Sequence, residues 1–389
     1  MGTTLLINPG SSSKKYALYR GTDPVMALRF EQTGHGYSVC SELKGTKGLC
    51  REVSASEFQN ALSIVLDEAV KEKHIAAAAA VARVGVRVVA PASYFTKHRL
   101  IDDEYVDRLS ALLPVAPLHI PSMLTEIERV KALIPEAEHI GVSDSAFHST
   151  ADKAILATSI PFEDAEQFDL HRFGYHGISV ASIVKHLVQK EGDVPERLVV
   201  CHIGSGVSVT GVQAGKSIGN SMGYSPASGV MMGSRMGDVP ADLLAAAIVR
   251  KGLKGNAIFE YLFNEGGFKG VAGVKDLRLV LDRAEKNDMD AIQALQMFAH
   301  QVKSLIASFA MHMGGLDMIV LTATAAERNP VVRSLLVGEL LALRTVLDET
   351  KNEALINSEG YIQTDDSDVK ILVLKTDELG EMYRIVSQF

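Results

Sequence analysis

Two glycine-containing turns carry side chains that suit the binding of a phosphate chain. The first lies in INPGSSSKKYAL, residues 7–18, and the second in HIGSGVSV, residues 202–209. The residues concerned are Asn8, Ser11, Ser13 and Lys15 around Gly10, and Gly204, Ser205 and Gly206. Backbone N–H groups at tight turns, hydroxyls and an ammonium group are donors that phosphate oxygens accept. We therefore predict a phosphate-binding loop at each turn.

The first turn also permits a different chemistry, because Ser-x-x-Lys occurs twice between residues 11 and 15, as Ser11 with Lys14 and Ser12 with Lys15. This pair is the nucleophile signature of penicillin-recognising acyl enzymes. Their partner motifs Ser-Asp-Asn and Lys-Thr-Gly are absent from the sequence. The first turn is not a Walker loop, because the spacing from its glycine to Gly-Lys-Ser/Thr is absent. The second turn is not a dinucleotide loop, because its third glycine is missing. Phosphate binding is the favoured interpretation.

Several single polar residues stand in loops bounded by glycine or proline. They are Arg87, His119, Asp144, His176 and Arg235. Each one alone is typical of a structural ion pair or of a histidine bonded to a carbonyl. Together they contain the cations and hydrogen-bond donors that an anion needs, so they outline a site for an anionic substrate.

The elements that must position these residues alternate between strand and helix. Each glycine turn joins two apolar strands, and the recurrence about half a chain apart predicts two related halves. Residues 54–73 predict a helix with a capping box, Ser54 with Glu57, and an apolar face. That face is formed by Phe58, Leu62, Val65, Leu66 and Ala69. Strands are expected within 80–91, 139–149, 316–329 and 369–386, the last two leading into helices.

Composition limits the class of protein. With 47% hydrophobic residues in 389, the chain can form two cores, so we expect two domains with a boundary near residue 150. The net charge of −8 argues against nucleic acid or an anionic membrane as partner. The three cysteines lack metal-type spacing, which favours free thiols in a reducing compartment. Without a recognisable export signal or an apolar run of membrane-spanning length, we expect a cytoplasmic protein.

Eight strings resemble the acetate kinase family in order and spacing over nearly the whole chain. They are INPGSSSKKYAL, VRVVAPASYF, PVAPLHIPSM, SDSAFHST, FGYHGIS, HIGSGVSVTGVQAGKS, SMGYSPASGVMMGSRMGD and GVKDLR. The resemblance implies the ribonuclease H-like fold of the actin-like ATPase and sugar kinase superfamily, two α/β domains around a central cleft. Residues 1–150, completed by a C-terminal helix over 377–389, would form the first domain. Residues 151–376 would bind nucleotide and form a homodimer.

The same resemblance implies reversible transfer of the ATP γ-phosphoryl group to acetate or propionate, giving acyl phosphate such as acetyl phosphate and ADP, with Mg²⁺ or Mn²⁺. The catalytic residues would be Arg87, His119, Asp144, His176 and Arg235. The acyl pocket would be Val89, Leu118, Tyr175 and Pro226, together with Arg87. The metal would lie at Asn8 and Glu378. The nucleotide and its phosphates would contact Ser11, Ser13, Lys15, His202, Gly204, Ser205, Gly206, Asp276, Leu277, Arg278, Thr324, Ala325 and Ala326.

The chain departs from the family pattern at several of these positions. Tyr175 stands where phenylalanine is usual, which narrows the pocket and favours a small acid. Residues 322–328 read TATAAER in place of a threonine followed by Gly-Ile-Gly-Glu-Asn, so both glycines are lost. Ser205 replaces an asparagine, and residues 90–92 read APA in place of His-Gly-Gly. These changes leave two alternatives open: a pyrophosphate- or other-nucleotide-dependent enzyme, and a metabolite-binding homologue without activity.

Overall fold

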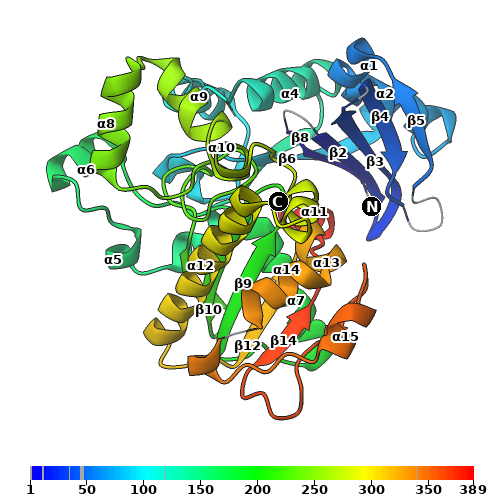
Figure 1. The fold of residues 1–389 in the computed structure, drawn as a ribbon. Coiled ribbons are helices and arrows are strands. Elements are labelled where there is room, and N and C mark those ends of the chain that lie inside the picture. The colour runs from blue at the N-terminus through cyan, green and yellow to red at the C-terminus, as the bar shows by residue number, and fades with distance from the viewer. Residues whose placement is uncertain (1, 11–12, 35, 44–47, 119, 339) are drawn as a thin grey trace. The chain divides into compact units, whose positions relative to one another are not determined.

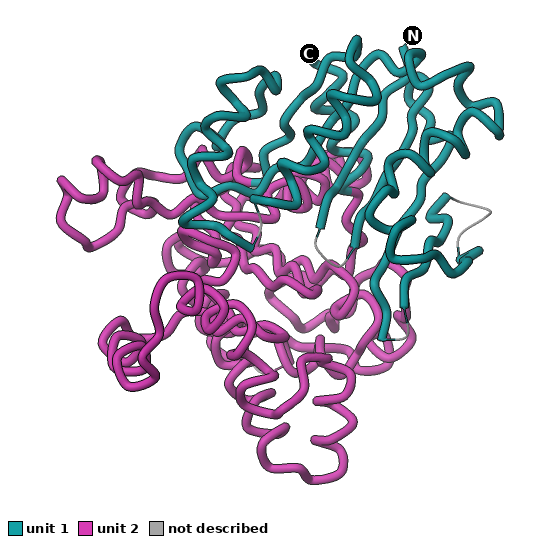
Figure 2. The backbone as a smooth tube through the Cα atoms, turned by 90° about the horizontal axis from the view of Figure 1, so that it is seen from above, with its two compact units in different colours: residues 1–144, 378–389 teal, residues 145–377 magenta. Residues whose placement is uncertain are grey.

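The computed structural model of the chain describes residues 2–10, 13–34, 36–43, 48–118, 120–338 and 340–389. The chain divides into two compact units, coloured separately in Figure 2. Unit 1 contains residues 1–144 and 378–389, and unit 2 contains residues 145–377. The chain therefore passes into unit 2 just before the boundary expected at residue 150, and its last helix returns to unit 1.

Unit 1 is built on one sheet in the order β5-β4-β3-β2-β1-β6-β8-β7 (Figure 1). Its strands are β1 (Thr3–Asn8), β2 (Ser13–Arg20), β3 (Asp23–Thr33), β4 (Gly36–Ser41), β5 (Cys50–Val53), β6 (Val81–Val88), β7 (Arg99–Leu100) and β8 (Glu138–Ser143). Its helices are α1 (Ala55–Gln59), α2 (Ala61–Lys71), α3 (Asp103–Ser110), α4 (Ile120–Leu133) and α16 (Glu378–Val386), with short 3₁₀ turns at Ala78–Ala80 and Ser93–Thr96. Strands β1, β6 and β8 run parallel, as expected for βαβ-type connections.

The two faces of this sheet are covered by different helices. Helices α2, α3 and α4 pack on one face, where alternate residues such as Ile7, Tyr16 and Val86 form the core with them. Helix α16 lies on the other face. There a Cβ added to Gly85 would come within 2.5 Å of Val386, and Tyr383 stacks on Tyr19. Because successive side chains of a strand point to opposite faces, the residue parity decides which side chains meet α16.

Unit 2 is built on a second sheet in the order β11-β10-β9-β12-β14-β13. Its strands are β9 (Arg197–Ile203), β10 (Val207–Gln213), β11 (Lys216–Asn220), β12 (Met318–Thr322), β13 (Gly360–Tyr361) and β14 (Lys370–Val373). Its helices are α5 (Lys153–Leu156), α6 (Phe162–Phe168), α7 (Gly177–Glu191), α8 (Ala241–Lys251), α9 (Asn256–Asn264), α10 (Gly267–Ala272), α11 (Leu277–Glu285), α12 (Met289–His312), α13 (Thr324–Arg328), α14 (Pro330–Val337) and α15 (Glu349–Ala354), with 3₁₀ turns at Ala146–Thr150 and Leu341–Leu343. Helix α7 packs on one face, and α12, through Phe309, packs on the other.

The two sheets share one plan, as expected for the two related halves predicted from the glycine turns. The orders β3-β2-β1-β6-β8 and β11-β10-β9-β12-β14 correspond strand for strand. In each, the first three strands are antiparallel and the last three are parallel. The glycine turns are the first hairpins of the two halves, β1–β2 and β9–β10.

The capping box at Ser54 and Glu57 is confirmed, and the five apolar residues of the predicted face are buried. The helix is nevertheless interrupted at Asn60, which is the C-cap of α1 and the N-cap of α2. None of the helices in the described part of the chain combines the length and the apolarity that crossing a membrane requires.

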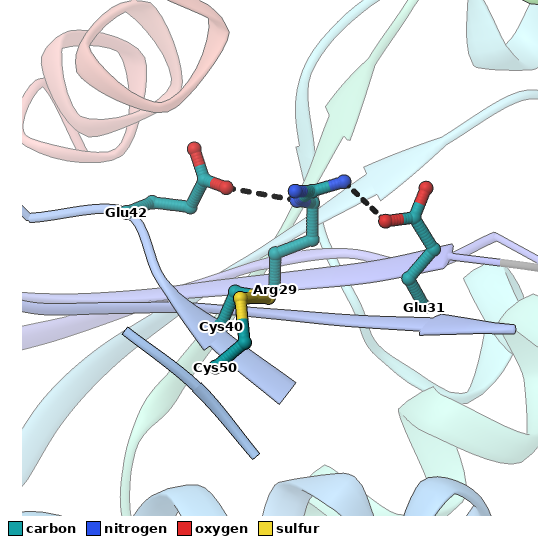
Figure 3. Close-up of a disulfide and its surroundings, with 5 residues drawn as sticks. All are labelled: Arg29, Glu31, Cys40, Glu42 and Cys50. Carbon is teal, nitrogen blue, oxygen red and sulfur yellow. Dashed lines mark hydrogen bonds and ion pairs between the residues drawn. A yellow bond between two sulfur atoms is a disulfide. The ribbon is translucent and has the colours of Figure 1, made fainter. Parts of the chain in front are cut away.

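The prediction of three free thiols is wrong for two of them. Cys40 and Cys50 face each other across β4 and β5 and form a disulfide, with Cα atoms 4.1 Å apart (Figure 3). The figure also shows Arg29, directly opposite Cys40 on β3, contacting Glu31 and Glu42. Sequence spacing could not reveal the bond, because it depends on the register between the edge strand β5 and its neighbour β4. Cys201 is free and buried, and burial raises the pKa of its thiol to about 12.

Candidate active site

Three predicted site residues of unit 1 share the α16 face of its sheet. Asn8 ends β1, and Lys15 of β2 is its direct cross-strand partner. Arg87 lies near the carboxyl end of β6, two residues after Gly85, which faces α16. Strand alternation therefore brings Asn8, Lys15 and Arg87 to the same face, where Glu378 begins α16. The carboxyl ends of parallel strands are where open α/β sheets bind ligands.

Arg87 is the centre of a hydrogen-bonded cluster within unit 1. Its Nε and Nη2 donate to Oδ1 and Oδ2 of Asp144, at 3.1 and 2.8 Å, in bidentate geometry. Its Nη1 donates to Oδ1 of Asn8 at 3.1 Å, and Nδ2 of Asn8 donates to Oε2 of Glu378 at 3.3 Å. Of the predicted catalytic and metal residues, the structure thus brings Asn8, Arg87, Asp144 and Glu378 together.

The charges of this cluster are partly or fully buried. Asp144 is 1% exposed, and the Arg87 side chain is 17% exposed. Burial alone would lower the pKa of Arg87, but the carboxylates of Asp144 and Glu378 outweigh it and raise that pKa, so the guanidinium stays charged. A guanidinium has five N–H donors, and the three bonds above leave two. Those two suit an incoming carboxylate or phosphoryl oxygen.

The position of Asp144 is fixed through its backbone and its neighbour Ser143. The N–H of Asp144 donates to the carbonyl of Val88 at 3.0 Å. The N–H of Ser143 donates to Nδ1 of His98 at 3.1 Å, which requires that nitrogen to be unprotonated. Burial, and secondarily the charge of Arg384, lowers the pKa of His98 to about 4. His98 therefore stays neutral at physiological pH and keeps accepting this bond.

The two adjacent lysines of the first turn have different surroundings. Lys15 is opposite Asn8 on the α16 face. Lys14 points to the opposite face, where its Nζ contacts Oε1 of the buried Glu126 at 2.6 Å. Tyr16 donates to the same carboxylate at 3.0 Å. Lys14 therefore forms an ion pair with a residue of α4. This argues against an acyl-serine motif made of Ser11 and Lys14.

The remaining predicted residues of unit 1 lie as follows. Gly10 is needed for the turn, since an added Cβ would lie 2.6 Å from the carbonyl oxygen of Ser13. Ser13 begins β2, Val89 follows β6, and Leu118 precedes α4; all three are partly exposed. Ser11 and His119 lie outside the described residues, so their predicted roles stay predictions.

In unit 2, two predicted residues, His176 and His202, stack with ring centroids 4.0 Å apart. His202 lies at the end of β9, opposite Ser208 of β10 and beside Thr322 of β12. His176 Nδ1 is 3.0 Å from the Ser208 hydroxyl, and His202 Nδ1 is 2.9 Å from the hydroxyl of Ser179. Each ring is thus held by a serine at Nδ1, which directs its Nε2 elsewhere.

The second glycine turn lies beside this histidine pair. A Cβ added to Gly206 would be 3.0 Å from the His176 ring and 3.6 Å from Nη1 of Arg235. A side chain at this position would be in tight contact with the His176 ring, so glycine suits the close approach. The turn therefore brings together Gly206, His176 and Arg235, with Gly204 and the exposed Ser205 next to them.

Arg235 and Tyr175 are connected through one loop segment of unit 2. Nη1 of Arg235 donates to the carbonyl of Pro226 at 3.1 Å. The Tyr175 hydroxyl, which the family pattern lacks, donates to the carbonyl of Tyr224 at 2.6 Å. Tyr175 is 1% exposed, and its buried hydroxyl is satisfied by this bond inside unit 2. The hydroxyl thereby fixes the segment that carries Pro226.

The predicted nucleotide residues form two groups in unit 2. Asp276 caps α11 by accepting from the N–H of Arg278, and its carboxylate also binds the exposed guanidinium of Arg278. Leu277 lies between them. Thr324, Ala325 and Ala326 form the start of the short helix α13, where Thr324 is exposed and Ala326 is fully buried. The lost glycines thus lie in helical backbone.

Three residues of this region were missed by the sequence reasoning. Ser179 and Ser208 orient the histidines, and Thr322 is fully buried at the end of β12 with no hydrogen-bond partner for its hydroxyl among the described residues. The signal for Ser208 was available, because strand alternation from the turn places it opposite His202. Ser179 could not be found in this way, because it belongs to α7.

Comparison with known proteins supports the resemblance. The profile of the Acetokinase family matches residues 3–383. The chain belongs to the acetokinase family. It is 34% identical to the acetate kinase of Clostridium botulinum strain Alaska E43, over 96% of both chains. It is also similar to the solved propionate kinase of Francisella tularensis, with a TM-score of 0.89 and 28% identity over 100% of both chains.

Another solved relative is the acetate kinase of Porphyromonas gingivalis, with a TM-score of 0.85 and 26% identity, covering 100% of this chain and 99% of that one. These similarities extend over both units, so the expected two-domain α/β fold of this acetokinase family member is confirmed.

Proposed function

We propose that this protein is an acetate or propionate kinase that transfers the γ-phosphoryl group of ATP to a short-chain carboxylate, reversibly, giving acyl phosphate and ADP. Membership of the acetokinase family and the solved acetate and propionate kinases support this assignment. The observation that carries it is the partly buried cluster of Arg87 with Asp144, Asn8 and Glu378, in which the remaining donors of Arg87 suit a carboxylate or a phosphoryl oxygen.

The proposed reaction needs charge neutralisation more than proton transfer. A carboxylate is already ionised at neutral pH, so it can attack phosphorus without a general base. Two like charges about 4 Å apart cost roughly 4 kcal/mol at an effective dielectric of 20. We propose that Arg87 and Arg235 hold the carboxylate and the transferred phosphoryl group, and that His176 donates to the phosphoryl oxygens. His119 would support His176, and Asp144 keeps Arg87 oriented.

The phosphates of ATP are assigned to the two glycine turns and the adjoining strand ends. Ser11, Ser13 and Lys15 would bind at the first turn, and His202, Gly204, Ser205 and Gly206 at the second. The buried hydroxyl of Thr322 has no hydrogen-bond partner in the described ranges of the chain. It supports the second assignment, because a buried donor without an acceptor is costly until a ligand supplies one. Asp276, Leu277, Arg278, Thr324, Ala325 and Ala326 would contact the nucleoside.

The donor set fits Mg²⁺ at the Asn8–Glu378 end of the cluster, and Mn²⁺ could replace it. The described residues contain no group of three or more histidines, cysteines or acidic residues that could hold a metal. This suits a magnesium ion that is held by one carboxylate, by waters and by the phosphates of its nucleotide. Glu378 would supply the carboxylate, and Asn8, whose amide donates to it, would keep it in place. The ion would neutralise phosphate charge.

The acyl pocket is assigned to Val89, Leu118, Tyr175 and Pro226. A tyrosine in place of phenylalanine makes an apolar space smaller, so we propose acetate or propionate rather than a longer acid.

We further propose a homodimer and a cytoplasmic location. Helix α8 supports the dimer: its sequence is largely apolar, yet none of its residues is buried, and Leu243 and Val249 are 58% and 79% exposed. Such a surface needs a partner. Light scattering should give twice the chain mass, and Leu243→Asp with Val249→Asp should give the monomer. The cytoplasmic location is supported by the need for ATP, which the cytoplasm supplies, and cell fractionation tests it.

One assay tests the proposed reaction. Purified protein, acetate, Mg²⁺ and hydroxylamine are incubated with ATP, GTP or pyrophosphate in parallel, and acyl hydroxamate is measured. We expect product with ATP. Product with pyrophosphate alone would show that pyrophosphate, and not ATP, is the phosphoryl donor. Absence of product with every donor would favour a metabolite-binding protein without activity. In the same assay, Arg87→Ala and Arg235→Ala should each lower kcat by about 10³ or more, and the double variant should lose little beyond that.

A further inference from the structure

Arg333 of α14 is a buried arginine that the proposed reaction does not use. It is 0% exposed, and it heads the largest fully buried side chains of the described residues. Its Nε donates to Oδ1 of Asn352 at 2.7 Å, its Nη1 to the carbonyl of Ala326 at 2.7 Å, and its Nη2 to the carbonyl of Leu355 at 2.8 Å. Nη2 also donates to the carbonyl of Asn352. One guanidinium thus joins α13, α14 and α15.

All these acceptors are uncharged. Among the ion pairs found in the described ranges, none includes Arg333, and burial lowers its pKa. A buried charge without a counterion is costly, so it needs strong compensation. The compensation comes from carbonyls in the last turns of α13 and α15, the negative ends of these helices. A guanidinium suits this role because its five donors reach several acceptors at fixed angles.

Helix α13 depends on such support from outside. It has only five residues, too few for a stable isolated helix. It begins after Ala323, whose backbone has φ 69° and ψ 168°, a region that is populated almost only by glycine. Backbone of this kind persists only where its surroundings fix it. At its C-terminal end, α13 is held by the Arg333 bond to Ala326 and by a bond from the Asn357 N–H to the Glu327 carbonyl at 2.9 Å.

We propose that Arg333 is the positioning residue that holds α13 in place for the nucleotide. The inference rests on the proposed function, in which Thr324 to Ala326 contact ATP. Glycines in this segment would let the backbone follow the nucleoside, whereas a helical, alanine-rich segment must be fixed in advance. Arg333 touches neither substrate, and it acts through the carbonyl of Ala326.

The test separates ATP binding from acetate binding. Arg333→Met keeps most of the volume without donors, and Arg333→Lys keeps the charge without the fork. Both should raise KM for ATP about tenfold or more, with KM for acetate within twofold of wild type. The control, Arg108→Met on the exposed side of α3, should change neither constant. Circular dichroism establishes that each variant is folded.

Should the Arg333 variants fail to fold, Asn352→Ala removes one acceptor and keeps the guanidinium, and a smaller selective rise in KM for ATP, about threefold, is expected. Equal changes in both KM values, or no change in either, would overturn the inference while the wild-type enzyme still uses ATP. If wild-type protein forms no hydroxamate with ATP, the proposed function and the inference both fail.

Discussion

Replacing Ala323 by glycine should stabilise the protein, although an alanine-to-glycine change usually destabilises. The backbone of Ala323 has φ 69° and ψ 168°, a conformation that costs about 1–3 kcal/mol for a residue other than glycine. Glycine gains freedom in the unfolded chain, which costs about 0.4–1 kcal/mol. The difference favours Ala323→Gly by about 1 kcal/mol.

A matched control lies two residues further along the chain. Ala325 is in the helical backbone of α13, so Ala325→Gly should cost about 1 kcal/mol. The two variants have the same composition and differ only in the backbone conformation at the substituted position. They should therefore differ from each other by about 2 kcal/mol.

Urea denaturation measures this difference. With an m-value of about 3 kcal/mol per molar, the two midpoints should be about 0.7 M apart, with Ala323→Gly above wild type and Ala325→Gly below it. Equal destabilisation by both variants would refute the reasoning, because it would show that Ala323 does not adopt the strained conformation.

Three further outcomes are expected. Reducing the Cys40–Cys50 disulfide should lower the free energy of unfolding by about 2.7 kcal/mol, because the unfolded chain regains the entropy of a loop with a ten-residue separation. Denaturation with and without reductant measures this change, and an unchanged midpoint would contradict it. Because the pKa of His98 is lowered in the folded state, the protein should lose up to about 3 kcal/mol of stability as pH falls from 6.5 to about 4, where the unfolded chain takes up the proton first. His98→Asn should reduce this dependence of stability on pH, and an unchanged dependence would exclude His98 as its source. Tyr175→Phe should raise the KM for acetate about two- to tenfold, because one buried hydrogen bond is lost. It should also raise kcat/KM for propionate relative to acetate, because the pocket gains space. Unchanged selectivity would place the hydroxyl outside the acyl pocket.

Much of the framework could be predicted from local sequence. Both strand–turn–strand hairpins, the capping box at Ser54, and the strands that end before Asp144 and at Thr322 follow from alternation, glycine and cap preferences. Such signals act over a few residues, so one sequence is enough to read them. The grouping of Asn8, Arg87 and Asp144 also agrees with their positions at the carboxyl ends of neighbouring parallel strands.

Other features depend on which segments meet, and local patterns do not contain that information. The difference between Lys14 and Lys15 depends on which face of β2 is covered by α4, and on Glu126, 112 residues away. The Cys40–Cys50 bond depends on strand register. Neither an ion pair over such a separation nor a pairing at the edge of a sheet leaves a trace in spacing.

The common strand order of the two sheets has a consequence for how the chemistry could arise. If both halves descend from one ancestral unit, corresponding strand ends were once identical and have since specialised. At the end of β1 the first half carries Asn8, while the second has His202 at the end of β9; β6 carries Arg87, while β12 carries Thr322. At these two positions the first half carries an amide and a guanidinium, and the second half carries an imidazole and a hydroxyl. Under this descent, one strand plan presents two different sets of polar groups at equivalent positions.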